Sequence, residues 1–528
     1  MNQVDPTSCQ RVLEKPRKVL FHYGEGLRYE QMPAGSRLIH GPPPLPAIAD
    51  VDGAIAHALD HPLDSPPLAA CLRPGMKVTI AFDDLCVPLP AMRRPDLRQR
   101  VIGQVLERLA AAGVDDIHLI AAISVHRRMT PSELRGILGR RIFNAFHPHR
   151  LYNHDAEDPD NLLSLGRTDA GEVVEINRRA MESDLLIYVN INIASQSGGH
   201  KAIPTGLGTY RSLRHHHNPG TMMQSRSYMD PPHSALHHSV ERMGRLVEQQ
   251  LKVFRIETVV NNASLPWPVD FMGRPVWTHN AFDRALLQGS RLVTGIAPTG
   301  LKRAVYARIQ APYGLLAIHA GATEAVHPRT LEAVYRQHAV AVQGQADVVV
   351  AGIPYLGPYS VNSIMNPVLV TCLGLGYFFN FYRGKPLLRR GGVFILLHPL
   401  YEQFHPIHHP SYIDFYRRVL PQTTDPAQIE ARFEEEFATD PRYIELYRRS
   451  YAFHGVHALY AWYWACHGLA HAGRVIAVSS PHSRAAQVMG FHTAPNLAAA
   501  LEQAQEVVGS SPSITSYQTP PYLLCDVS

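Results

Sequence analysis

Short apolar runs alternate with amphipathic stretches early in the chain. Residues 76–82 form an apolar run after a Pro-Gly pair, and residues 117–124 form a second run. Between them, residues 95–112 place their leucine, isoleucine and valine side chains on one helical face. A strand, a helix and a strand with short connections predict a βαβ unit with parallel strands. Thr130 and Glu133 form a capping box that predicts the start of another helix.

The same alternation continues toward the C-terminus. Residues 184–192 predict a third buried strand, and a second strand–helix series begins near residue 256, with strands expected at 256–261, 347–353, 392–398 and 474–479. Residues 401–471 are helical, aromatic and rich in histidine, which is typical of an insertion between two strands. We therefore predict an α/β fold with mostly parallel sheets, divided into an N-terminal domain (1–270), a C-terminal domain (271–508, with the helical insertion at about 401–471) and a loose tail (509–528).

Both ends of the chain and its most apolar stretch carry weaker patterns. Residues 1–75 are rich in proline and predict an extended lead-in with one short helix at 48–59. Residues 1–18 lack the apolar core of a signal peptide. Residues 365–382 are strongly apolar but are interrupted by proline, glycine and asparagine, which favours a buried helix or a helix plus loop over a membrane span.

Composition narrows the class of protein. The 528 residues are 45% hydrophobic and 18% charged, as in ordinary globular domains, and the formal charge is only +5. Without a run of lysine and arginine we expect no nucleic-acid partner. Six cysteines without a CxxC pair or disulfide-framework spacing fit a reducing compartment, and we expect a soluble cytoplasmic enzyme with a small-molecule substrate.

Polar groups follow three of the predicted parallel strands. Asp84 follows the first strand, His126 the second, and the Gly198–Lys201 loop the third. Ligands bind at the carboxyl edge of open α/β sheets, so these residues predict a site. The alternative for Asp84 alone is that it only caps a loop.

Lysine is scarce in this chain, so the lysine of the Gly-Gly-His-Lys stretch is a candidate functional residue. Only seven of the 50 basic residues are lysine, and Lys201 is one of them. The stretch lacks P-loop spacing, but Gly198 and Gly199 allow a close approach of the backbone to a phosphate or cofactor, while the amine supplies a charge or a nucleophile. The alternative is an ordinary turn with a surface lysine.

Histidine is abundant, with 30 in the chain, and several are grouped. Adjacent histidines on a strand point to opposite faces, so at most two of His215, His216 and His217 share a site. A solvated surface cluster is the alternative. His467 and His471 have helical spacing but no HExxH glutamate, so packing is favoured there. His405, His408 and His409 give an equally weak signal.

Several ordered motifs lie between residues 125 and 217. They are Val125-His126-Arg127-Arg128-Met129-Thr130 with Glu133-Leu134, His154-Asp155 followed by Leu165-Gly166-Arg167-Thr168, and Ser197-Gly198-Gly199-His200-Lys201 with Pro204, Gly206 and His217. Together they resemble the motifs of the lactate racemase family, enzymes that use a nickel-pincer nucleotide. The similarity is good over roughly residues 45–300 and thinner beyond them. It implies two α/β domains with the site in the cleft between them.

The resemblance also implies roles for individual residues. Lys201 would tether the cofactor beside Gly198 and Gly199, and His217 would be the nickel ligand. His126 would be the first acid/base, and Asp84 would lie near the pyridinium-derived cofactor. The base takes the hydroxyl proton of a 2-hydroxy acid while the cofactor takes the carbon-bound hydride. The enzymes that build the cofactor are the implied protein partners.

Three departures from the family pattern concern the substrate. Val87 stands where the family has a substrate-contacting arginine, and Ile191 where it has a second acid/base histidine. The family's Y-Q-x-x-K segment is missing, and the nearest stretch offers only Asn362 and Asn366. We therefore expect a racemase or epimerase whose substrate differs from lactate, such as a sugar or a larger polyol acid. The missing polar contacts would come from Asn190, Asn192, His200, His215 or His216. The alternative is a relative that binds a nucleotide-like ligand or a metal without hydride chemistry.

Overall fold

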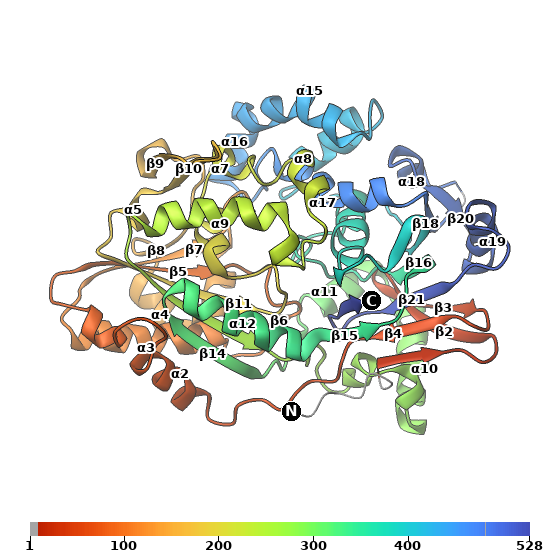
Figure 1. Ribbon diagram of the computed structural model, residues 1–528, viewed down its shortest axis with the longest axis horizontal. Helices are drawn as coiled ribbons and strands as arrows, with labels where there is room; N and C mark the ends of the chain where they lie inside the picture. The colour runs from red at the N-terminus through yellow and green to blue at the C-terminus, as the bar shows by residue number, and fades with distance from the viewer. Residues whose placement is uncertain (1–8, 481) are drawn as a thin grey trace.

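Two open sheets organise the chain in the computed structural model, which describes residues 9–480 and 482–528 (Figure 1). The six-stranded sheet has the order β14-β12-β11-β5-β7-β8, and the seven-stranded sheet has the order β1-β4-β21-β16-β18-β19-β20. The strands of the first sheet are β5 (Lys77–Asp83), β7 (Asp116–Ala122), β8 (Leu151–Asn153), β11 (Leu185–Asn192), β12 (Val253–Val260) and β14 (Leu315–Gly321). Those of the second are β1 (Gln10–Val12), β4 (Arg37–His40), β16 (Ala346–Gly352), β18 (Leu388–Leu397), β19 (Arg474–Val478), β20 (His492–Ala494) and β21 (Ile514–Gln518).

Helices cover both faces of the first sheet. Five of its strands run parallel and β14 runs antiparallel to β12. One face packs against α2 (Val51–Asp60), α3 (Leu97–Ala111) and α4 (Pro131–Phe146), and the other against α6 (Ala202–Gly206) and α9 (Ala235–Glu248) (Figure 1). Because successive side chains of a strand alternate between faces, Ile187 and Val189 of β11 join the first cluster while Leu186 and Tyr188 join the second. Double coverage confirms the predicted α/β class.

The second sheet is also covered on both faces. Helix α19 (Leu497–Val508) packs on one face, while α13 (Pro367–Thr371), a π-helical turn (Cys372–Phe378) and α17 (His457–His471) lie in the cluster on the other. The stretch 365–382 is thus a buried helix plus loop, as predicted. Within the described residues, no helix is both long enough and apolar enough to cross a membrane.

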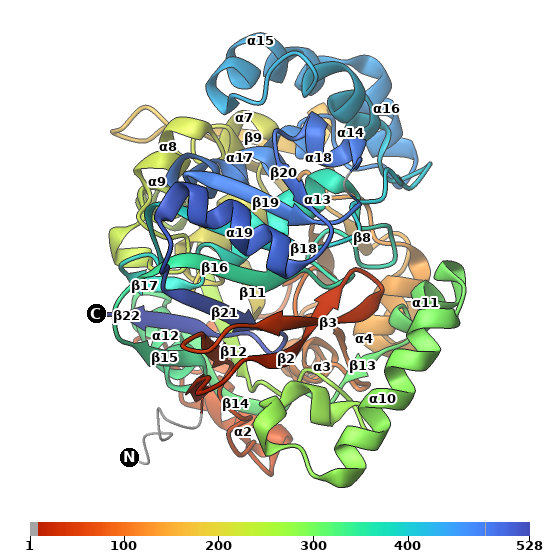
Figure 2. The same cartoon turned by 90° about the vertical axis from the view of Figure 1, so that its right-hand side faces the viewer.

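A helical segment lies between β18 and β19, which confirms the predicted insertion. Its helices α14 (Pro410–Asp414), α15 (Pro426–Thr439), α16 (Pro441–Arg449) and α17 lie together above the second sheet (Figure 2). The strands predicted at 76–82, 117–124, 184–192, 256–261, 347–353, 392–398 and 474–479 are all present within a few residues of their expected bounds. So are the helices predicted at 95–112 and from Thr130.

Both ends of the chain differ from prediction. The expected lead-in contains the helix α2, but it also contains β1, β4 and the hairpin of β2 (Arg17–Tyr23) and β3 (Gly26–Met32). The expected loose tail is wrong for β21 and for β22 (Leu524–Val527). These short segments carry little periodicity of their own, and partners far along the chain hold them: β21 pairs with β4 and β16, and β22 with β15 (Ala339–Val342). The two sheets therefore do not follow the predicted division at residue 270. Strands β1 and β4, from the predicted N-terminal domain, lie in the second sheet, and β14, from the predicted C-terminal domain, lies in the first.

Candidate functional site

The loops that follow β5, β7 and β11 line one cavity of about 190 Å³. These three strands are neighbours in the sheet, so their carboxyl ends lie side by side. Asp84, His126 and Lys201 all line the cavity, and so do Gly198 and His217. The structure therefore brings together the predicted site residues; Gly199 lies in the same loop. We call this space the polar cavity.

Asp84 and His126 form a close pair. The Nδ1 atom of His126 lies 2.8 Å from Oδ2 of Asp84, and the backbone N–H of Cys86 donates to Oδ1 over 2.9 Å. Asp84 is only 5% exposed, and burial acts to raise its pKa, but His126 and Cys86 lower it further than burial raises it. The carboxylate is therefore charged and holds the imidazole through Nδ1, which leaves Nε2 for proton transfer.

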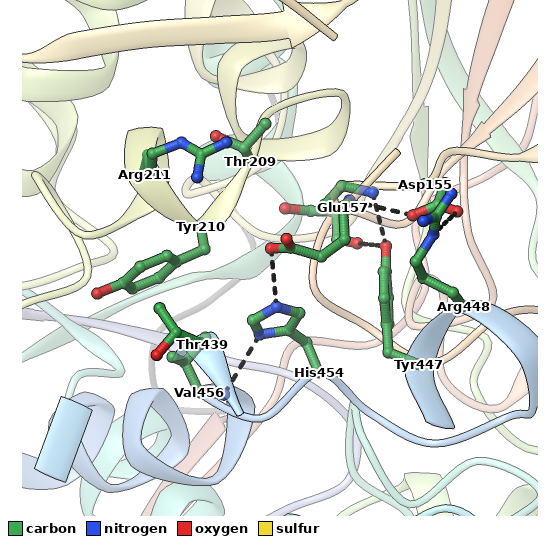
Figure 3. A network of polar contacts seen from close by, with 12 residues as sticks. Asp155, Glu157, Thr209, Tyr210, Arg211, Thr439, Tyr447, Arg448, His454 and Val456 are labelled. Atoms are coloured by element: carbon green, nitrogen blue, oxygen red, sulfur yellow. Dashed lines mark hydrogen bonds and ion pairs between the residues drawn. The ribbon is translucent and has the colours of Figure 1, made fainter. Parts of the chain in front are cut away.

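Residues of the helical insertion hold the backbone just before His126. Ser124 has φ 46°, in the left-handed region that a non-glycine residue seldom adopts. The hydroxyl of Tyr447 donates to the Ser124 carbonyl over 2.7 Å, and the backbone N–H of His454 donates to Val125 over 3.2 Å. Around them, Arg448 pairs with Asp155 and the His454 ring with Glu157 (Figure 3). The insertion thus fixes the segment that carries His126.

The glycine loop leaves no room for side chains. Gly198 and Gly199 have φ 82° and 62°. A Cβ atom on Gly198 would lie 2.6 Å from Glu257, and one on Gly199 would lie 2.7 Å from His327. The backbone N–H of Gly199 donates to Glu257 over 2.6 Å. Burial acts to raise the pKa of Glu257, but His327 outweighs it and the pKa falls to about 2. A buried carboxylate therefore supports this loop.

Lys201 has an unusual amine. Its Nζ donates to the Gln196 carbonyl over 2.8 Å, and burial lowers its pKa to about 8 against the attraction of Asp83. Asp83 accepts hydrogen bonds from the Asn190 side chain and the Ile191 backbone, and burial raises its pKa to about 7. With a pKa of about 8, about a tenth of the Lys201 amine is neutral at pH 7 and can act as a nucleophile, far more than for an ordinary lysine.

His217 lies in a turn after α7 (Tyr210–Leu213), where its backbone N–H donates to Leu213 over 2.8 Å. Its ring centroid is 5.6 Å from that of Trp464, and burial lowers its pKa to about 3, so the imidazole is neutral. The assumption of an extended segment here is wrong, because the chain turns. His215 does not line the polar cavity, and neither does the fully buried His216.

Several buried polar atoms of the lining have no hydrogen-bond partner among the described residues. They are Oγ of Ser124, Oδ1 of Asn190, Oε1 of Gln196, Oγ1 of Thr205, Nδ1 of His217, the hydroxyl of Tyr460 and Nε1 of Trp464. An unpaired buried polar atom costs about 1–3 kcal/mol, so native proteins seldom leave one unexplained. Seven such atoms around one cavity fit a polar ligand that hydrogen-bonds to them.

Sequence reasoning missed the opposite wall of the cavity. Tyr359 and Tyr377 line it from beyond β16, and His457, Tyr460 and Trp464 from α17 or its start. His457 is 3% exposed, and its Nδ1 lies 2.7 Å from the Tyr412 hydroxyl. Its ring centroid lies 5.2 Å from that of His126. The His-rich insertion was visible in the sequence, but nothing there distinguished His457 from its neighbours.

The two family positions that differ in this chain have different surroundings. Val87 lines the polar cavity, whereas Ile191 packs with Met92 and Leu97 in an apolar cluster. Asn190, one residue earlier, points to the other face of β11 and lines the cavity. Among the other proposed contacts, Asn192, His200 and His215 do not line it. His467 and His471 lie against Phe379, with ring centroids 5.2 and 5.1 Å away, which fits packing.

A metal-binding arrangement is also present in the polar cavity. Ligand atoms of Asp84, Cys86 and His126 all lie within 4.8 Å of one another, and no other such group occurs in the described part of the chain. The Cys86 sulfur lies 3.7 Å from Nδ1 of His126. Carboxylate, thiol and imidazole are ligands that suit zinc and related ions.

The N-terminal part of the chain is similar in sequence to known proteins. Residues 23–230 match the lactate racemase N-terminal domain. The chain is 26% identical over 169 residues to the lactate racemase of Lactiplantibacillus plantarum, covering 31% of this chain and 38% of that protein. It is 23% identical over 167 residues to the lactate racemase of Thermoanaerobacterium thermosaccharolyticum, covering 31% and 37%. The matched segment thus spans less than half the length of these curated relatives.

Solved structures share the whole fold. The lactate racemase apoprotein of Thermoanaerobacterium thermosaccharolyticum superposes with a TM-score of 0.61 at 15% identity, covering 96% of this chain and 100% of that one. A protein of Thermotoga maritima gives a TM-score of 0.50 at 14% identity, covering 90% and 97%. The resemblance predicted from the motifs is therefore confirmed. Residues 23–230 thus resemble the lactate racemase N-terminal domain, and the chain as a whole shares the fold of the lactate racemase apoprotein.

Proposed function

We propose that the chain is a racemase or epimerase of a 2-hydroxy acid or a related hydroxylated compound, and that it uses a nickel-pincer nucleotide held by Lys201. The observation that carries the proposal is the convergence of the Asp84–His126 pair, the glycine loop and Lys201 on one cavity. Asp84, His126 and the Gly198–Lys201 loop follow three different parallel strands, and their combination matches the family motifs.

The residues of the polar cavity fit the cofactor. Gly198 and Gly199 keep side chains away from the space beside Lys201, and the lowered pKa of Lys201 favours a covalent bond through its amine. His217 is neutral, as a metal ligand must be. The unpaired Asn190 and Thr205 oxygens offer hydrogen bonds to a polar group. When bound, the nucleotide supplies a reversible acceptor for the carbon-bound hydride.

The protein's own residues then handle the proton. Nε2 of His126 takes the substrate hydroxyl proton, and the Asp84 carboxylate stabilises the resulting imidazolium. Reaction of both hands of the substrate needs a second acid/base group, which Ile191 cannot supply. We assign that role to His457, because it lines the same cavity and its Nδ1 is held by the Tyr412 hydroxyl.

Neutral hydrogen bonds hold the substrate in this proposal. Val87 offers no charge, and no arginine lines the polar cavity among the residues that the structure describes. A planar carboxylate is usually bound by a bidentate arginine. The hydroxyls of Tyr359 and Tyr377, 3.1 Å apart, are available instead, and burial raises the pKa of Tyr359 so that it stays protonated.

Co-expression with the cofactor-building enzymes tests the proposal. The purified protein should then contain nickel, show a visible absorbance band and interconvert the stereoisomers of a hydroxylated substrate, as followed by chiral chromatography. Protein expressed without those enzymes is the control. Equal nickel content and no interconversion in both preparations would reject the proposal.

A second candidate is metal or ligand binding without hydride chemistry. The cluster of Asp84, Cys86 and His126 supports it, because these three ligand types can bind a divalent ion directly. Under this alternative the protein would bind zinc stoichiometrically without the cofactor-building enzymes. Cys86→Ser would weaken that zinc binding, whereas cofactor loading through Lys201 does not need the Cys86 thiol.

A further inference from the structure

A second cavity of about 190 Å³ adjoins the polar cavity, and we call it the apolar chamber. Its walls come from the loops after β5, β11, β16 and β21 and from the π-helical turn. Typical lining residues are Leu89, Ile193, Met229, Leu356, Leu373 and Phe378. The chamber is as large as the polar cavity but has a different chemistry.

The two spaces share part of their walls. Cys86, Val87, Gln196, Ser197, Pro358 and Tyr377 line both of them. The Cys86 sulfur lies 3.7 Å from Nδ1 of His126, so the shared wall is next to the proposed acid/base. A substrate whose hydroxyl is within reach of His126 can therefore place a substituent in the chamber.

The chamber contains no formal charge. Its described lining includes no aspartate, glutamate, lysine or arginine. His22 is the one histidine in that lining, and burial lowers its pKa to about 4, so it is neutral at physiological pH. A carboxylate or phosphate would lose its hydration in such a space without gaining a partner of opposite charge. In the described lining, only His22, Gln196 and Tyr522 have buried side-chain polar atoms without a partner, too few for the several hydroxyls of a sugar, which disfavours the polyol expected from the sequence.

The volume of the apolar chamber limits the size of the substrate substituent that it can hold. An apolar cavity of about 150 Å³ is large enough to bind benzene. The gain from burial is proportional to the apolar surface removed from water, so a ring gains considerably more here than a methyl group. The chamber thus suits a group the size of a phenyl ring or a branched alkyl chain.

We infer that the apolar chamber is the specificity pocket of the enzyme, and that the substrate is a hydroxy compound with a phenyl-sized apolar substituent on its hydroxyl-bearing carbon or the next one. This inference rests on the proposed function for the reaction itself. It goes beyond it in naming the substrate class, which neither the family motifs nor Val87 alone determines.

Kinetics with the cofactor-loaded protein provide the first test. We expect kcat/KM for 2-hydroxy-3-phenylpropanoate and its amide to exceed that for lactate and its amide by at least about tenfold. Leu356→Trp places a ring in the chamber and should abolish this preference while leaving the small substrates within about twofold. Leu356 is partly buried and lines the apolar chamber but not the polar cavity, so it is not one of the proposed catalytic residues. Leu165→Trp, a partly buried leucine packed on another cluster, is the matched control.

Calorimetry with the cofactor-free protein gives a second readout that needs no catalysis. The uncharged probe 3-phenylpropan-1-ol should bind to wild-type protein and to Leu165→Trp, and at least about tenfold more weakly to Leu356→Trp. Propan-1-ol should not bind measurably. If Leu356→Trp does not fold, Ile309→Trp fills the same chamber from another wall.

The outcomes separate the two proposals. Turnover of small hydroxy compounds without a preference for the phenyl substrates, or probe binding that both chamber variants retain, would overturn the specificity inference and leave the proposed function standing. Absence of any turnover combined with probe binding that Leu356→Trp removes would reject the proposed function and keep the chamber's ligand class.

Discussion

The two parallel sheets present their carboxyl ends to the same pair of cavities but contribute different chemistry. The loops after β5, β7 and β11 supply carboxylates, an imidazole and an amine, namely Asp84, His126 and Lys201 with their partners. The loops after β16 and β21 supply proline, leucine and tyrosine, and those side chains line part of the apolar chamber together with the π-helical turn. Under the proposed function, the first sheet supplies the tether and the first acid/base, and the second side supplies His457 and part of the specificity pocket.

The two sides also differ in the charge of their paired groups. On the first sheet, Asp84 and Glu257 are buried carboxylates, each held by a histidine and a backbone N–H. On the other side, Tyr359 and His457 contact each other edge to face, with ring centroids 4.7 Å apart. A change on the first side should therefore remove chemistry, whereas a change on the second should mainly alter rate and selectivity.

The largest effect is expected at His126. His126→Ala removes the group that takes the hydroxyl proton and should lower turnover by about 10² or more. Nickel content should stay at the wild-type level, because the tether and the nickel ligand are untouched. His126→Gln, which keeps a polar side chain beside Asp84, should be equally slow. Near-normal turnover of either variant would remove His126 from the mechanism.

The pKa of Lys201 predicts a large effect on amine reactivity. Only the neutral amine is acylated, and a pKa lowered to about 8 leaves about half of it neutral at pH 8, compared with less than about 1% for an ordinary lysine. Acylation of cofactor-free protein, followed by peptide mass spectrometry, should rise with pH and reach half its maximal rate near pH 8. A half-maximal rate above pH 10 would show that the amine is ordinary and solvated.

A smaller effect is expected on the opposite wall. His457→Gln should lower turnover by about 10²-fold, the low end of acid/base contributions, and leave nickel content unchanged. Tyr412→Phe removes the hydroxyl that holds Nδ1 of His457 and should have a weaker effect in the same direction. Unchanged kcat and KM in both variants would restrict His457 to packing.

The smallest effect tests the contact between insertion and sheet. Tyr447→Phe leaves the Ser124 carbonyl and the Ala156 N–H without their shared partner and should cost about 1–3 kcal/mol in the free energy of unfolding. A slight fall in turnover should accompany it, because this hydroxyl holds the segment before His126. Tyr443→Phe, whose hydroxyl binds Asp414 within the insertion, is the control and should leave turnover unchanged.

Much of the first sheet and its loops was predictable from sequence for a physical reason. Apolar runs mark buried strands, and the residues directly after them lie at the binding edge whatever the remaining chain does, so Asp84, His126 and Lys201 were found together. Their roles remain predictions. Strand β21 was missed because Ile514–Gln518 has no apolar run and is buried only through its pairing with β4 and β16.

The second wall was beyond sequence reasoning for a related reason. His457 begins a helix that is buried on almost every side, so neither periodicity nor neighbouring polar residues indicated which side chain faces a cavity. The limit of two site histidines among residues 215–217 assumed a strand, whereas the chain turns after Leu213. Contacts between distant segments decide both cases, and such contacts leave no local pattern.

Intact-protein and peptide mass spectrometry of the co-expressed protein, with nickel measured on the same sample, tests the central claim most directly. The account predicts an adduct on the peptide that contains Lys201, about one nickel per chain, and loss of both in Lys201→Arg, because a guanidinium stays protonated and is a poor nucleophile. An unmodified Lys201 peptide, or a Lys201→Arg variant that keeps full nickel and activity, would contradict it.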